Sequence, residues 1–256
     1  MSESVIMCEG FHDRAFWKGW LTYLGCTDLG AATAGKTRPA QILDPFGVEV
    51  KGGQFAYHST RGAFLRVVPC HGRSKVLHEA RVRLLLRNTK ALMRLVLNID
   101  ADLNADGSAT AATGLRHQDV EQFIRTQVDP SAAVNADGEV EIDGGATKVA
   151  LVRWETADPH ALTLPAQQTL ERLVSAALIA AYPTRAKPIQ DWLASRPAPP
   201  PPDPKEHSRS HMAGWYAEHG CESFFSNLWS DPKIVGEMES RLRLSGAWRI
   251  AEALAS

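Results

Sequence analysis

The stretch RLVLNIDAD, residues Arg94 to Asp102, is an apolar run that ends in two carboxylates one residue apart. Its length and composition predict a short, fully buried strand, although periodicity alone also allows a buried helix. If the chain stays extended through Asp102, Asp100 and Asp102 point the same way from the carboxyl end of this strand. Two like charges side by side repel unless a cation bridges them, and Mg²⁺ is typically held by one or two carboxylates with water and phosphate. The stretch therefore predicts a divalent-metal site at a strand end.

Length and composition limit the number of domains, the binding partners and the cellular location that the chain can have. The 256 residues can bury a good core, as one domain with an appendage or as two small domains. The net charge of −1 gives no overall attraction to nucleic acid, so a polyanion would have to meet a local basic patch or a metal. The four cysteines are scattered without a CxxC pair and no signal peptide precedes the first predicted strand, so we expect a cytoplasmic protein. The longest apolar run, residues 173–182, is about half of a membrane span, and we expect no membrane segment.

A second acidic motif lies near the amino terminus. Val5–Cys8 predicts a short strand, Glu9 stands at its end, and a helical apolar pattern follows from Phe16 to Leu24. Gly10 suits the tight turn between the strand and the helix. A strand-end carboxylate followed by glycine at such a turn is where open α/β sheets place ligand sites. Asp13 either caps the helix or reaches toward Glu9.

These two motifs, Val5–Asp13 (VIMCEGFHD) and, about ninety positions later, Val96–Asp102 (VLNIDAD), resemble the signature of the Toprim domain. That signature is a Glu-Gly strand end and a later Asp-x-Asp strand end, and it is shared by topoisomerases, bacterial primases and OLD-family nucleases. The spacing is closest to OLD-like nucleases and small uncharacterised Toprim-related proteins, over roughly residues 3–180. The resemblance implies an α/β fold with a mostly parallel sheet of about four strands flanked by helices, and acidic residues that bind Mg²⁺.

The expected chemistry is phosphodiester cleavage at the four strand-end acids. We assign Glu9 and Asp100 to a first Mg²⁺ ion, and Asp102 and Asp13 to the same or a second ion, with Mn²⁺ able to substitute. The metal would stabilise charge and activate a water as the nucleophile. The acids would converge if the two strands are neighbours. Related nucleases carry a further acid beyond the Asp-x-Asp strand, for which Glu171 on a strongly apolar predicted helix is the match; an exposed helix-surface glutamate is the alternative.

Four basic side chains flank the second predicted strand, Phe64–Val68. They are His58, Arg61, His71 and Arg73. Such residues either form a rim that contacts substrate phosphates or belong to an ordinary solvated surface. We select Arg61 and Arg73 as candidate substrate-binding residues.

Two further motifs imitate known ligand sites. Gly30–Thr37 (GAATAGKT) matches the Walker A pattern, but the polar segment before it and the prolines after it leave neither the strand nor the helix of a P-loop. A loop, or a contact of Lys36 with a substrate backbone, is the preferred interpretation. Asp102–Gly107 imitates half of an EF-hand loop, yet the expected twelfth-position glutamate is Thr113. Asp106 is then a turn residue or a supporting ligand.

A proline-rich linker, residues 196–204 (RPAPPPPDP), is the clearest boundary in the chain. It predicts a Toprim-like α/β domain over residues 1–195 and a helical extension over residues 205–256. The extension is expected to close over the acidic site, or to contact a second copy or a protein partner. Lys205, at its start, is a candidate phosphate contact.

The leading hypothesis is a Mg²⁺-dependent hydrolase of phosphodiester bonds in DNA or RNA. The alternative is a catalytically silent Toprim-like protein that binds nucleic acid or regulates a partner. A third class, a P-loop nucleotide hydrolase, would need nucleotide binding that is lost in Lys36→Ala. Topoisomerase chemistry would need a tyrosine nucleophile in another domain, and the four tyrosines have unsuitable settings.

Overall fold

The computed structural model describes residues 2–30, 41–102, 115–156, 168–195 and 221–256, together with Met212 and Trp215. The chain divides into two compact units. The first comprises Met1–Ile99, Leu115–Val152 and Arg249–Ser256, and the second comprises Asp100–Gly114 and Arg153–Trp248.

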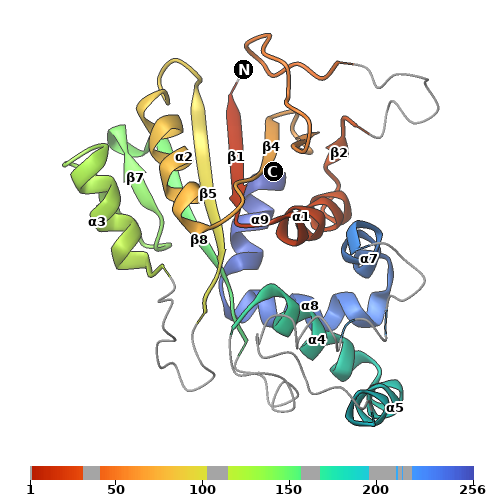
Figure 1. The fold of residues 1–256 in the computed structure, drawn as a ribbon. Coiled ribbons are helices and arrows are strands. Elements are labelled where there is room, and N and C mark those ends of the chain that lie inside the picture. Colours follow the sequence, from red (N-terminus) through yellow and green to blue (C-terminus); the bar gives the residue numbers. More distant parts are fainter. Residues whose placement is uncertain are drawn as a thin grey trace. The chain divides into compact units, whose positions relative to one another are not determined.

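An eight-stranded sheet runs in the order β2-β3-β4-β1-β5-β8-β7-β6 (Figure 1). Its central strands β1 and β5 are apolar, as the two acidic motifs predicted, and β5 is a strand and not a buried helix. The strands are β1 Glu3–Cys8, β2 Thr27–Asp28, β3 Phe55–His58, β4 Phe64–Pro69, β5 Leu92–Asp100, β6 Ala133–Val134, β7 Val140–Ile142 and β8 Thr147–Trp154.

The expected fold, a mostly parallel sheet of about four strands, is wrong. Among the described residues, β1 pairs in parallel with β4 and with β5, whereas β2–β3, β3–β4, β6–β7 and β7–β8 pair in antiparallel fashion. Three antiparallel pairs, β3–β4, β6–β7 and β7–β8, have short connections, such as residues 59–63 between β3 and β4, whereas residues 29–54 separate β2 from β3. Antiparallel neighbours need only a short turn, whereas parallel neighbours need a long crossover. The result is a mixed, mostly antiparallel sheet flanked by helices.

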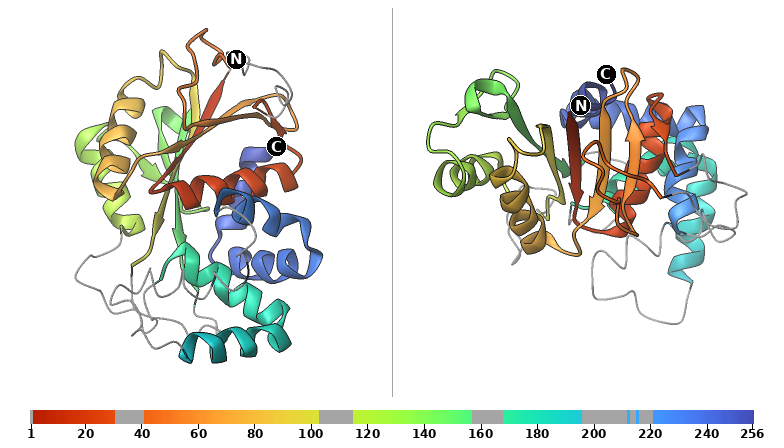
Figure 2. Two further views of the ribbon diagram at one scale, coloured as in Figure 1. Left: turned by 45° about the vertical axis from the view of Figure 1, so that its right-hand side comes forward. Right: turned by 90° about the horizontal axis from the view of Figure 1, so that it is seen from above.

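In the first unit, strand alternation assigns side chains to the two faces of the sheet. Leu95, Leu97 and Ile99 share a buried cluster with α2 (Arg73–Leu85) and α3 (His117–Gln127). Asn98, on the opposite face of β5, accepts a hydrogen bond from the indole of Trp17 in α1 (Phe11–Tyr23). Helices α2 and α3 therefore cover one face and α1 covers the other (Figure 1; Figure 2).

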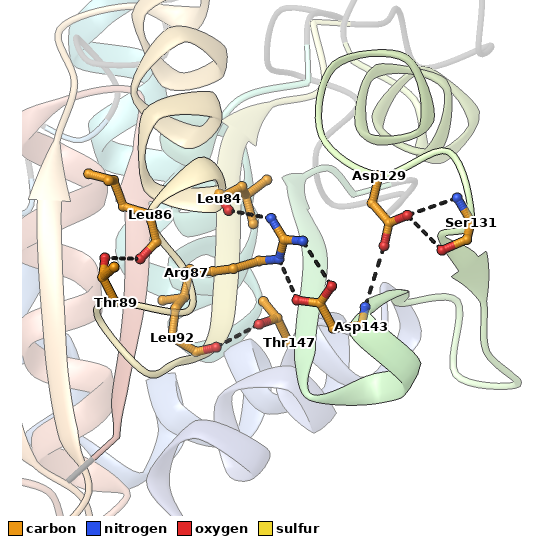
Figure 3. A network of polar contacts seen from close by, with 9 residues as sticks. All are labelled: Leu84, Leu86, Arg87, Thr89, Leu92, Asp129, Ser131, Asp143 and Thr147. Atoms are coloured by element: carbon orange, nitrogen blue, oxygen red, sulfur yellow. Dashed lines mark hydrogen bonds and ion pairs between the residues drawn. The ribbon is translucent and has the colours of Figure 1, made fainter.

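A polar network fastens the end of α2 to the β7–β8 turn within the first unit (Figure 3). Arg87 donates to both carboxylate oxygens of Asp143, with Nε–Oδ2 2.6 Å and Nη2–Oδ1 2.8 Å. The Asp143 amide donates to Asp129, which also accepts from Ser131. Hydrogen bonds from Arg87 hold the pKa of the Asp143 carboxyl below its ordinary value. A two-point guanidinium–carboxylate contact fixes direction as well as distance, so it orients the turn.

The second unit is helical around α4. Residues Leu170 to Leu178 of α4 (Leu170–Ala181) are all buried, so this helix is enclosed on every side. It packs against α8 (Pro232–Leu244), whose first turn is capped by Asp231 through bonds from the Lys233 and Ile234 amides. The other described helical elements of this unit are α5 Pro183–Ala194, α7 Cys221–Asn227 and η4 Leu228–Ser230. Helix α9, Ala247–Ala255, belongs to the first unit from Arg249 onward, and the short η2, Asp143–Gly145, lies in the first unit. Within the described ranges, no helix is long and apolar enough to cross a membrane.

Candidate functional site

The two acidic motifs follow neighbouring parallel strands. The pairing of β1 with β5 runs as far as Cys8 opposite Asn98, and the Glu9 amide donates to the Asn98 carbonyl at 3.1 Å. Glu9 is half-buried and directly follows β1, and Asp100 is the last residue of β5. The two strands are therefore neighbours in the sheet, as the hypothesis of a shared acidic site required.

Asp13 caps the turn that follows Glu9. Its Oδ2 accepts a hydrogen bond from the Gly10 amide at 2.8 Å, and the side chain is only 4% exposed. A Cβ atom on Gly10 would lie 3.3 Å from this same Oδ2, so glycine leaves room for the carboxylate to approach. Of the two roles predicted for Asp13, the capping role is confirmed.

The loop after β4 joins the same strand end. The Cys70 amide donates to the Cys8 carbonyl at 2.8 Å and the Gly72 amide donates to the Glu9 carbonyl at 2.9 Å. His71 and Gly72 have positive φ angles of 59° and 118°, after which α2 begins at Arg73. The carboxyl ends of β1 and β4 thus carry Glu9, His71 and the first turn of a helix.

Burial keeps the cysteines of this edge protonated. It raises the pKa of Cys8 well above the ordinary value, and the nearby Asp13 and Cys70 act in the same direction. Burial also raises the pKa of Cys70 to about 11. Thiolate is the nucleophilic form of cysteine, so neither side chain is suited to covalent catalysis near neutral pH.

Arg61 and Arg73 lie at opposite ends of β4. Arg61 precedes the first residue of this strand, Phe64, and lies in the β3–β4 connection with an exposed side chain. Arg73 follows the last residue, Pro69, and is partly buried. A six-residue strand is about 20 Å long, so the two arginines do not form one rim. Only Arg73 shares a strand end with Glu9.

In the second unit, Asp100 and Asp102 contact the segment that starts α4. Asp100 is 2% exposed, and its Oδ1 accepts a hydrogen bond from the Leu170 amide at 2.9 Å. The Asp102 amide donates to the Gln168 carbonyl at 2.9 Å, and Asp102 has a φ angle of 50°. The chain is therefore not extended through Asp102, and the shared face that continuous extension would give does not form. Aspartate tolerates this left-handed conformation better than most residues.

Glu171 lies in the first turn of α4 and is 1% exposed, which contradicts the alternative of an exposed surface glutamate. The helix starts with Thr169, whose hydroxyl accepts from the Arg172 amide at 3.2 Å. Arg172 and Ser175 are equally buried. Asp100 and Glu171 thus belong to a buried polar group at the amino end of α4, where the helix dipole favours negative charge.

Sequence reasoning missed the role of Asn98. Its side chain is fully buried, accepts from Trp17 Nε1 at 2.9 Å and donates to the Val152 carbonyl at 3.3 Å. It thereby joins α1, β5 and β8 within the first unit. An asparagine inside an otherwise apolar strand was the available signal, because a buried amide has to find partners.

Carboxylate oxygens suit Mg²⁺, but they are not gathered into a large cluster. In the part of the chain that the structure describes, no group of three or more His, Cys, Asp or Glu side chains is arranged to hold a metal ion. A metal here would take one or two carboxylates and complete its shell with water and phosphate. Lys36, Asp106, Lys205, and residues 31–37 of the Walker-like motif lie outside the described residues.

Comparison with known proteins establishes a related fold and nothing about activity. No family model and no curated protein matches the chain. Among solved structures, a hypothetical protein from Pyrococcus horikoshii OT3 is similar, with a TM-score of 0.64 and 13% identity over 100% of both chains. At this identity the likeness concerns the fold alone.

Proposed function

We propose that the protein is a Mg²⁺-dependent hydrolase of phosphodiester bonds in nucleic acid, with Mn²⁺ able to substitute. One or two carboxylates drawn from Glu9, Asp13, Asp100 and Asp102 would hold the metal, and water and substrate phosphate would complete its shell. The observation that supports this proposal is the parallel pairing of β1 with β5, which gives neighbouring strands an acidic motif at each carboxyl end. Open α/β sheets bind ligands at the carboxyl ends of their strands.

The protein groups have separate tasks in this proposal. The Gly10 amide donates to one oxygen of Asp13, and the Leu170 amide donates to one oxygen of Asp100. These bonds fix the orientation of the two carboxylates. A carboxylate has two oxygens and about four lone-pair positions, so one such bond leaves coordinating capacity. When bound, Mg²⁺ would supply charge stabilisation and a more acidic water. Arg73, after the strand end that carries Glu9, would contact a substrate phosphate.

One observation favours a second candidate, a nucleic-acid-binding or regulatory protein without turnover. Asp13 and Asp100 both accept amide hydrogen bonds at helix starts, and this is a sufficient structural reason for an acidic residue at each position. In that case the acids stabilise the fold and no bond is cleaved. If the protein is a hydrolase, removal of a negative charge at these acids abolishes cleavage. If it is a silent binding protein, there is no cleavage to lose and nucleic-acid binding stays unchanged.

The proposal also includes a setting and partners. We place the activity in the cytoplasm, because Cys8, Cys26 and Cys70 are free and buried thiols. DNA or RNA is the proposed substrate. The C-terminal helices would contact a second copy or a protein partner, for which Leu244, 88% exposed at the end of α8, is a suitable contact residue.

The decisive experiment compares charge-removing variants that preserve shape. Asp102→Asn retains a side chain that tolerates a positive φ angle, and Glu9→Gln retains its size. We expect either change to reduce Mg²⁺- or Mn²⁺-dependent cleavage of plasmid DNA or single-stranded RNA by roughly 100-fold, the loss typical when one stabilising group is removed. Asp191→Asn is the matched control, because Asp191 pairs only with the exposed Lys187 on α5 among the contacts described.

The outcomes separate the two candidates. Cleavage that is abolished by EDTA and by both variants, and retained by Asp191→Asn, supports the hydrolase. Wild-type protein that binds nucleic acid without cleaving it under any metal condition supports the silent protein. Cleavage that survives both Asp102→Asn and Glu9→Gln at the wild-type rate would refute the assigned site.

A further inference from the structure

A cavity of about 390 Å³ lies within the second unit, where α4 ends and α8 begins. Its floor is apolar and consists of the buried side chains of Leu178, Phe224, Leu228 and Ile234. This volume is at the lower end of the range of small-molecule pockets, about 300–1,000 Å³. The cavity shares no residue with the acidic motifs, so it has to be explained separately.

Two aromatic rings and the Arg185 guanidinium line the cavity, and a second cation, Lys233, lies next to the lining residue Tyr182. Tyr182 and Trp215 are half-buried there, with ring centroids 6.2 Å apart and ring planes inclined at 44°. The Arg185 guanidinium lies 5.0 Å from the centre of the Trp215 ring, and the Lys233 ammonium lies 5.5 Å from the centre of the Tyr182 ring. Two positive charges thus stand beside two flat aromatic surfaces.

The one carboxylate in the lining is already engaged in hydrogen bonds within the protein. Asp231 accepts from the Tyr182 hydroxyl at 2.5 Å, and its other oxygen accepts from the Lys233 and Ile234 amides at the start of α8. These bonds use the negative charge for capping and hold the Tyr182 ring in place. The lining therefore offers a ligand aromatic surface and the positive charge of Arg185, with the Lys233 charge nearby.

We propose that this cavity binds a nucleobase, from a free nucleotide or from an unpaired position of a nucleic acid strand. Trp215 and Tyr182 supply stacking surfaces, and Arg185 and Lys233 supply cations for the adjoining phosphate. The exposed Asn227 lines the cavity and carries both an amide donor and a carbonyl acceptor, as reading of a base edge requires. The proposal goes beyond the hydrolase, because it uses none of the acidic residues and no metal.

The test measures binding to the full-length protein in the presence of EDTA, so that metal-dependent cleavage plays no part. The probes are a fluorescein-labelled oligothymidylate, followed by anisotropy, and AMP, followed by calorimetry. We expect Trp215→Ala and Arg185→Ala each to weaken binding by roughly 5- to 100-fold, comparable to the loss of one base–aromatic stack. Trp215→Phe retains a flat ring and should restore most of the affinity.

Trp192→Ala is the matched control, since Trp192 is a 53% exposed indole of the same unit that does not line the cavity. Arg185 is exposed, so its loss is not expected to disturb folding, and it serves as the check if Trp215→Ala is unstable. If AMP binds, and Trp215→Ala and Arg185→Ala weaken this binding while Trp192→Ala does not, the cavity is a nucleotide site. If only the oligonucleotide binds in this way, the cavity is a site for a nucleic acid strand.

Three results would overturn the proposal. One is wild-type protein that binds neither probe, and another is equal loss of affinity in Trp215→Ala and Trp192→Ala. The third is binding of a labelled acidic peptide when neither nucleotide probe binds. This binding would be weakened by Trp215→Ala and Arg185→Ala and retained by Trp215→Phe. The hydrolase has its own readout, because Asp102→Asn should abolish cleavage and leave this binding unchanged.

Discussion

Two single acids of the candidate site, Asp13 and Asp100, are anchored to backbone amides. Asp13 accepts from Gly10 three positions earlier, and Asp100 accepts from Leu170 seventy positions later. Asp100 is 2% exposed, and a buried amide that loses its acceptor bears the full cost of desolvation. The contact between Asp100 and Leu170 therefore predicts an effect on stability that is separate from any effect on catalysis.

We predict that Asp100→Ala lowers the free energy of unfolding by about 1–3 kcal/mol, because the Leu170 amide loses its acceptor. Asp100→Asn keeps an oxygen at the same place and should retain most of the stability, although its negative charge is gone. Urea denaturation followed by circular dichroism measures both, with Asp191→Ala on α5 as an exposed control. Equal stability of the Ala and Asn variants would show that this hydrogen bond has no such role.

Local patterns predicted part of this site. The apolar run before Asp100 predicted β5, and the Gly10 turn with its capping Asp13 follows from residues three apart. The conformation of Asp102 could not be predicted in this way. Its φ of 50° accompanies a bond from its amide to the Gln168 carbonyl, and no local periodicity reports so distant a partner. The metal-binding role of these acids stays a prediction.

At the scale of elements, Arg66 in β4 ties two other segments to the sheet. Its Nε lies 2.8 Å from Glu3 Oε1 in β1, and its Nη2 lies 2.8 Å from Asp44 Oδ2. The other oxygen of Asp44 accepts from the Phe46 and Val48 amides, which closes the turn over residues 44–48. All three charged side chains are at most 7% exposed, so this ion cluster is a buried one.

The pH dependence of this cluster has a definite sign. Burial acts to raise the pKa of Asp44, but the bonds from the Val48 amide, Arg66 and the Phe46 amide outweigh it and leave the pKa lowered. A lowered pKa gives stability that is present above the unfolded value, near 3.9, and lost as pH falls through the folded value. For Glu3 burial prevails over Arg66 and raises the pKa, so protonation of Glu3 acts in the opposite direction.

We therefore predict that Asp44→Asn is less stable than the wild type at pH 7 and that the difference shrinks as pH falls below about 4. Glu3 is present in both proteins, but the Asp44 charge helps to raise the Glu3 pKa, so Asp44→Asn also brings that pKa closer to its ordinary value. Thermal melts from pH 7 to pH 3 measure the difference in stability, with Asp191→Asn as the exposed control. Parallel curves for Asp44→Asn and the wild type would mean that the Asp44 carboxylate does not contribute in this way.

Sequence patterns located many of the elements but not the architecture of the sheet. The apolar runs Val5–Cys8 and Phe64–Val68 predicted strands, and β1 and β4 form there. The two-residue strand β2, Thr27–Asp28, has no apolar pattern and exists only through its pairing with β3. Short edge strands depend on such non-local contacts more than on propensity. The resemblance of the central motifs therefore predicted a mostly parallel sheet of about four strands, whereas the sheet has eight strands that pair mostly in antiparallel fashion.

At the scale of the whole molecule, the chain passes between the two units after Ile99, Gly114, Val152 and Trp248. The two compact units thus differ from the ranges 1–195 and 205–256 that composition predicted. The linker between those ranges, residues 196–204, lies outside the described part, and the division by composition stays a prediction. The contacts of the last helices decide whether residues 1–195 can fold alone.

Each unit takes contacts from those last helices. In the first unit, the Thr60 amide and hydroxyl both donate to the Ala255 carbonyl, at 2.9 and 2.7 Å. Arg249 donates to the Asp137 carbonyl at 2.6 Å in the same unit. In the second unit, α8 packs against α4. The loss of residues 205–256 would therefore disturb both units.

We predict that residues 1–195 alone do not fold cooperatively. The truncation removes Ile234, Val235, Met238 and Leu242, which α8 buries. Burial of a large apolar side chain contributes about 1.5–3 kcal/mol, so four of them approach the 5–15 kcal/mol that stabilises a typical domain. Circular dichroism melts should show a sharp transition for the full chain and none for the truncated one, and co-expressed residues 205–256 should restore it. A truncated chain with the full-length melting temperature would instead establish residues 1–195 as a self-sufficient domain.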